Sequence, residues 1–107
     1  MSDPFEHHDE IHGESRSQLR VPVAIEGGVA NSTIGRRPAT LVDLSSRGCR
    51  IDWPFGATVG MVVVLKIPEL APIGARVRWR TATHIGLSFN TPLHQSVLDR
   101  IVAAHRP

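Results

Sequence analysis

The chain has 107 residues, 41% of them hydrophobic, which leaves room for one domain with a modest core and excludes a chain that is disordered throughout. No apolar run approaches the roughly 18 residues that span a bilayer, the N-terminus lacks a basic and apolar leader, and a single cysteine, Cys49, excludes an internal disulfide. We therefore expect a cytoplasmic protein that does not insert into a membrane.

The charged residues divide the chain into two parts. Residues 1–14 hold five of the ten acidic residues and no Lys or Arg, whereas the remainder holds all 12 basic residues. Eleven of the 12 are Arg, whose planar guanidinium suits phosphate groups and guanine edges. This composition favours an anionic partner, although a GC-rich genome produces the same bias toward Arg.

In chain order, residues 1–15 are polar without a hydrophobic period, and we expect a flexible acidic tail ahead of one folded domain over residues 16–107. Val21, Val23 and Ile25 recur at every second position from Val21 to Glu26, which predicts a first strand closed by a turn at Gly27-Gly28. Further strands are predicted at 38–44, 48–53, 60–67, 73–81 and 83–89. Six short, regularly spaced strands are typical of an antiparallel barrel or sandwich.

The C-terminal segment predicts a helix. Thr91 is a suitable N-cap and Pro92 a suitable first helical residue. Apolar residues then recur at helical spacing, at Leu93, Val97, Leu98, Ile101 and Val102. One amphipathic helix should therefore end the domain and pack on the mouth or flank of a barrel.

Two short motifs stand out. Arg16 to Arg20 form an RxxxR at the junction of the polar tail and the first strand, and Asp43 to Gly48 form a DxSxxG at a turn between strands. Each motif alone is weak, because short patterns of this kind arise often by chance. Their order and spacing together make the pattern specific.

With both motifs in this order, the chain resembles the PilZ domain family, the bacterial receptors of cyclic diguanylate (c-di-GMP). The resemblance extends to Val77-Arg78-Trp79 and to Ile85-Gly86-Leu87-Ser88-Phe89, which look like the late strand pair of that family. It implies a six-stranded antiparallel β-barrel with a C-terminal helix, in agreement with the periodicity. Because both motifs are intact, it also implies that the chain binds the nucleotide.

The resemblance implies that Arg16 and Arg20 bind c-di-GMP, because a guanidinium binds a phosphate or the O6/N7 edge of guanine and stacks on a base. Asp43 is the natural acceptor for guanine N1–H and N2–H₂, since an ionised carboxylate has two acceptor oxygens. Ser45 offers a hydroxyl. In the alternative interpretation, Asp43 or Ser45 only caps backbone N–H groups of a turn.

Two further residues belong to the predicted site. Gly48 lets a ligand or the backbone come close, or adopts a positive φ. In a regular strand Trp79 shares a face with Val77, which favours a core or rim position. In some PilZ relatives, however, an aromatic residue near this point meets the bound guanine, so both interpretations of Trp79 stay open.

The sequence contains no G-x-S-x-G elbow, P-loop or H-E-x-x-H, so we expect neither an enzyme nor a cofactor nor a metal site. Its aromatic and basic residues are not interleaved as in base-stacking platforms, which argues against a nucleic-acid polymer as partner. We expect a c-di-GMP sensor that signals to an unidentified protein through an N-terminal arm ordered by binding. The alternative is a protein–protein adaptor of PilZ-like fold with weak or no nucleotide binding.

Overall fold

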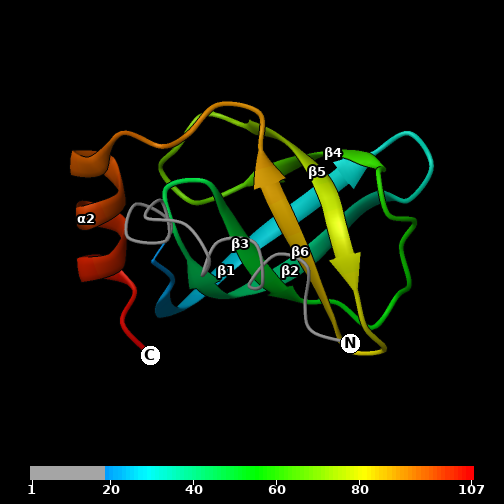
Figure 1. Ribbon diagram of the computed structural model, residues 1–107, viewed down its shortest axis with the longest axis horizontal. Helices are drawn as coiled ribbons and strands as arrows, with labels where there is room; N and C mark the ends of the chain where they lie inside the picture. The colour runs from blue at the N-terminus through cyan, green and yellow to red at the C-terminus, as the bar shows by residue number, and fades with distance from the viewer. Residues whose placement is uncertain (1–18) are drawn as a thin grey trace.

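The computed structural model describes residues 19–107, so the predicted tail over 1–15 and Arg16 lie outside the described residues. The described residues form six strands and one helix (Figure 1). In chain order these are β1 Val21–Asn31, β2 Gly35–Leu44, β3 Gly48–Asp52, β4 Val62–Lys66, β5 Ile73–Arg80, β6 His84–Phe89 and α2 Gln95–Ala104.

The strands close into a barrel in the order β1-β2-β3-β6-β5-β4, and every neighbouring pair is antiparallel. The closing pair is short, because β1 contributes only Gly28–Ala30 to its ladder with β4. The predicted six-stranded antiparallel barrel with one C-terminal helix is confirmed.

Alternate residues of the strands fill the barrel interior, as the period of two requires. The largest fully buried side chain is Trp53, directly after β3, whose indole Nε1–H donates to the Gly56 carbonyl oxygen at 2.9 Å. Cys49 is also buried, and burial raises the pKa of its thiol well above its ordinary range. The interior is thus apolar and closed, so a ligand site must lie on the outer surface.

The first strand is longer than its sequence pattern indicates. The predicted turn at Gly27-Gly28 is wrong, because β1 continues through both glycines to Asn31 and the chain reverses at residues 32–34. A Cβ on Gly27 would collide with the carbonyl oxygen of Lys66. The glycine therefore permits the close approach of β4 that closes the barrel, a use of glycine within strands that resembles a turn signal in the sequence.

The helix begins later than predicted. Thr91 and Pro92 lie in the loop before α2, and His94 is the N-cap, with its side chain accepting a backbone N–H of the first turn. The N–H of Leu93 donates to the carbonyl oxygen of Ser46 at 2.7 Å. This bond to the turn between β2 and β3 holds the loop in a non-helical path and delays the start of the helix.

The helix covers one end of the barrel (Figure 1). Leu98 and Ile101 are its buried residues, and both belong to the hydrophobic core. At the C-terminal end of the helix, the carbonyl oxygen of His105 accepts the backbone N–H of Ala24 in β1 at 2.9 Å. Within residues 19–107, no helix is both long and apolar enough to cross a membrane.

Candidate functional site

The motif from Asp43 to Gly48 spans the end of β2, a tight turn and the first residue of β3. Ser45 is fully buried, and its Oγ accepts the backbone N–H groups of Arg47 and Gly48 at 3.2 Å each. The same hydroxyl donates to the Gly48 carbonyl oxygen at 3.3 Å. Ser45 therefore stabilises the turn that follows Asp43, and its direct contact with a ligand stays a prediction.

Gly48 is needed for the packing of β3 on β6. A Cβ at this position would collide with the carbonyl oxygen of Leu87. Its φ is not in the left-handed region, which in the described chain holds Gly35, Gly56, Gly60 and the non-glycine residue Glu69. Of the roles predicted for Gly48, the structure shows the close backbone approach, and contact with a ligand stays a prediction.

A β-bulge turns Asp43 to the outside of the barrel. The register of β2 with β3 shifts between Leu41, which faces the interior opposite Ile51, and Asp43, which lies opposite Arg50. Arg50 stands between the buried residues Cys49 and Ile51, so its side chain faces outward. Without the extra residue in β2, Asp43 would share the interior face with Leu41.

A second bulge does the same for Trp79 in β5. Val77 faces the interior opposite Leu87, the register then shifts, and Trp79 lies opposite Gly86. Gly86 stands between the buried residues Ile85 and Leu87 and therefore faces outward. A Cβ on Gly86 would collide with Nε1 and Cε2 of the indole. The expectation that Trp79 shares a face with Val77 is thus wrong, because the bulge places the half-buried indole on the outer surface.

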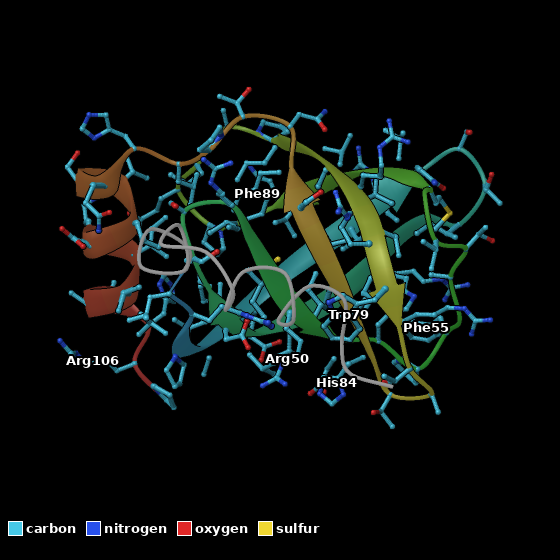
Figure 2. All side chains as sticks on the ribbon, in the orientation of Figure 1. Arg50, Phe55, Trp79, His84, Phe89 and Arg106 are labelled. Carbon is cyan, nitrogen blue, oxygen red and sulfur yellow. The ribbon has the colours of Figure 1, made fainter. Side chains whose placement is uncertain are left out.

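These outward residues form one row across four neighbouring strands, which we call the outer row: Asp43 of β2, Arg50 of β3, Gly86 of β6 and Trp79 of β5. Figure 2 shows Arg50 and Trp79 on this side of the barrel. Arg20, directly before β1, adjoins the row at the β2 end, where its Nη1 lies 3.9 Å from Asp43 Oδ2. Three residues of the predicted site, Arg20, Asp43 and Trp79, therefore lie along one surface.

Asp43 is a nearly buried carboxylate among positive charges. Its side chain is 9% exposed, and Oδ2 lies 3.1 Å from Nε of Arg50. Burial raises the pKa of Asp43 above its ordinary value, although the charges of Arg20, Arg50 and His84 and the backbone N–H of Arg50 act to lower it. The carboxylate therefore loses its proton less readily than an exposed Asp does.

Three polar atoms of the outer row have no hydrogen-bond partner although they are buried: Asp43 Oδ1, Arg50 Nε and Trp79 Nε1. The side-chain Nε–H of Arg50 is not aimed at Asp43 Oδ2, so the 3.1 Å contact between Nε and Oδ2 is an ion pair without a hydrogen bond. An unpaired buried polar group costs about 1–3 kcal/mol. Because no other side-chain atom within residues 19–107 is in this state, the outer row is the surface that a polar ligand would complete.

Sequence reasoning missed two members of this row, Arg50 and Gly86. A signal was present for both, because Arg50 alternates with buried residues and a glycine inside a strand often marks a close approach. Neither signal identifies the partner across the sheet. Ser45 and Gly48 lie in the adjoining turn, and Arg16 is outside the described residues.

A cavity elsewhere on the barrel is lined by residues of β1, β2 and β4, among them Gly28, Arg37 and Lys66. It measures about 480 Å³ and forms where Gly28 and Ala30 of β1 leave space between β2 and β4. Two of its cationic residues are already engaged, since Lys66 Nζ donates to the Leu70 carbonyl oxygen at 2.8 Å and the Arg37 guanidinium lies 4.6 Å from the Phe55 ring centroid. We therefore favour the outer row, with its unpaired polar atoms, as the functional site.

A comparison with known protein families identifies the family to which the chain belongs. The family model of the PilZ domain matches residues 14–104, which include both sequence motifs, all six strands and α2. Among curated proteins, no match is found. PilZ domains are binding and adaptor domains, not enzymes, and they form a family of c-di-GMP receptors. With a closed barrel of the expected topology and a match over most of its length, the chain belongs to the PilZ domain family.

Proposed function

We propose that this protein is a c-di-GMP sensor that binds the nucleotide along the outer row and signals to a partner protein. The observation that carries the proposal is the buried Asp43 carboxylate, whose Oδ1 has no hydrogen-bond partner although two arginines lie beside it. An acceptor of this kind matches the N1–H and N2–H₂ donors of guanine. The ligand would supply the hydrogen-bond partners that the fold leaves missing at these buried atoms.

The other side chains supply complementary contacts. Arg20, together with Arg16 from the same motif, binds a phosphate or the O6/N7 edge of guanine. The Trp79 indole offers an aromatic surface for stacking, which is worth about 1–3 kcal/mol per base. Ser45 and Gly48 support the site through the turn after Asp43. A few such contacts are enough for micromolar affinity, which corresponds to about −8.2 kcal/mol.

The relay to a partner uses the first residue of β1 and the residues just before it. Leu19 and Val21, on either side of Arg20, line a cavity of about 430 Å³ together with Leu98 and Val102 of α2. A ligand that holds Arg16 and Arg20 fixes this segment against the barrel, in an order–disorder switch. The surface beside α2 changes as a consequence, and a partner protein reads that surface. The nucleotide is the signal, and it is neither a cofactor nor a substrate.

Calorimetric titration with c-di-GMP tests the proposal. Arg20→Ala and Asp43→Ala should each weaken binding by about 2 kcal/mol or more, roughly 30-fold, because each removes a charged hydrogen-bonding group. Arg36→Ala is the matched control. It removes an exposed arginine of the same strand as Asp43, seven residues earlier and thus roughly 23 Å away.

The control variant should bind as the wild type does. The absence of heat and of chemical-shift changes at roughly 100 µM c-di-GMP, where micromolar binding is easily detected, would refute nucleotide binding. An equal loss of affinity for c-di-GMP in Arg36→Ala would show that the nucleotide binds through the general positive charge of the protein and not through contacts with the outer row.

A further inference from the structure

Arg50 lies at the centre of the outer row and has no assigned role. It pairs with Asp43 on one side and with Gly86 on the other, and the Trp79 indole covers Gly86. Its side chain is 43% exposed, whereas that of Asp43 is 9% exposed. The Arg50 side chain is therefore the more accessible of the two to a ligand at this surface.

The contact between Arg50 and Asp43 is incomplete. Their closest atoms, Nε and Oδ2, are 3.1 Å apart, yet Nε makes no hydrogen bond and Oδ1 accepts none. An arginine that served only to neutralise Asp43 would gain most from the two parallel hydrogen bonds that a guanidinium forms with a carboxylate. Here a donor and an acceptor stand side by side, and each has unused hydrogen-bonding capacity.

This arrangement matches one edge of one base. On its Watson–Crick edge, guanine presents the acceptor O6 next to the donors N1–H and N2–H₂, so it pairs with a donor beside an acceptor. Resting on the function proposed above, we propose that Arg50 determines base specificity by donating to O6 of the guanine whose N1–H and N2–H₂ are accepted by Asp43. Adenine carries an amino group in place of O6, so its donor would face the Arg50 donors without a partner.

The test separates base recognition from simple charge. Arg50→Met keeps most of the aliphatic length of the side chain and removes the guanidinium, while Arg36→Met removes the same charge from the start of β2. Each variant and the wild type are titrated with c-di-GMP and with cyclic diadenylate. We expect Arg50→Met to lower the preference for c-di-GMP by about tenfold or more, the discrimination that one base-edge contact supplies, whereas Arg36→Met should leave the preference unchanged.

A second measurement gives an answer even where cyclic diadenylate binds too weakly to quantify. The Nε–H resonance of Arg50, identified by its disappearance in Arg50→Met, should shift when c-di-GMP is added to the wild type, and that of Arg36 should not. A missing shift, or an equal loss of affinity for both nucleotides in Arg50→Met, shows that Arg50 contributes charge alone and overturns the inference while c-di-GMP binding stands. If the wild type binds no c-di-GMP, the proposed function fails and the inference fails with it.

Discussion

Asp43 is a residue at which the proposed ligand recognition and the stability of the fold oppose each other. Its carboxylate is nearly buried, and burial raises its pKa despite the neighbouring charges of Arg20 and Arg50. The folded state therefore binds this proton more tightly than the unfolded state does. Ionised Asp43 costs stability at neutral pH, and we attribute that cost to a site arranged for a nucleotide.

The first prediction concerns Asp43→Asn. In the wild type, the stability that accompanies protonation is fully present below the ordinary pKa of 3.8 and is lost as the pH rises through the raised pKa. Asn does not titrate, so the melting temperature of the variant minus that of the wild type should increase with pH across this range and then stay constant. Thermal melts of both proteins from about pH 4 to about pH 8 measure the difference.

Nucleotide binding by Asp43→Asn should be strongly reduced at neutral pH, because the amide offers one acceptor oxygen where the carboxylate offers two. Asp99→Asn is the control, since Asp99 is an exposed carboxylate on α2. The proposed cost of the buried charge would be contradicted if the melting temperature of Asp43→Asn minus that of the wild type did not change with pH. It would also be contradicted if this difference decreased as the pH rises.

At the scale of the elements, the site depends on two β-bulges. Each adds one residue to a strand, in β2 before Asp43 and in β5 before Trp79, and so reverses the face on which the next residues point. Regular strands would place both side chains in the apolar interior. The bulges instead align them with Arg50 and Gly86 on the outer surface.

The second prediction compares the glycines of this region. In Gly86→Ala the new Cβ meets the end of the Trp79 indole, a side chain outside the core that can rotate away. Binding should weaken by about 1–3 kcal/mol as stacking is lost, with little change in stability. In Gly48→Ala the Cβ meets the carbonyl oxygen of Leu87, so the backbone itself must shift and stability should fall by about 1–3 kcal/mol.

Chemical denaturation and calorimetry of both variants measure these effects, and tryptophan fluorescence reports the displacement of Trp79 in Gly86→Ala. If Gly86→Ala unfolds at the lower denaturant concentration of the two and binds normally, Trp79 is a structural residue and not part of the ligand surface.

At the scale of the whole molecule, the outer row, where we propose that the nucleotide binds, and α2 are linked through the start of β1. Arg20 contacts Asp43, and its neighbours Leu19 and Val21 line the cavity beside α2. Leu19 is 64% exposed, the largest exposure among the large hydrophobic residues of the described chain. A change in the position of this short segment therefore alters apolar surface next to the helix.

The third prediction tests this link. Addition of c-di-GMP should shift the amide resonances of Val102 and Ala103 in α2, which line the same cavity, and leave those of Ser32 and Thr33 in the turn after β1 unchanged. Deletion of residues 1–12 should keep the affinity within about threefold, less than about 0.7 kcal/mol, because both arginines of the RxxxR motif are retained. Deletion of residues 1–20 should abolish binding. Unchanged α2 amides at saturation would rule out this route of signalling.

The sequence by itself determined the number of strands, their succession along the chain and the terminal helix, and it contains both motifs of the proposed site. These features follow from local properties, since a period of two marks a strand and glycine, proline and serine mark the turns between strands. Ser45 illustrates this, because its hydrogen bonds lie within the turn that the motif itself forms.

Only the tertiary structure decided where β1 ends, which way Trp79 points and which residue faces Asp43. In the sequence Gly27 looks like a turn residue, and only its close contact with β4 explains a glycine inside the strand. Leu93 lies in a loop because the carbonyl oxygen of Ser46 accepts its N–H. A bulge is a property of two paired strands, so the residues around Trp79 contain no local sign of it. Arg50 and Gly86 join the site for the same reason, because register across the sheet depends on long-range pairing that no short stretch of sequence specifies.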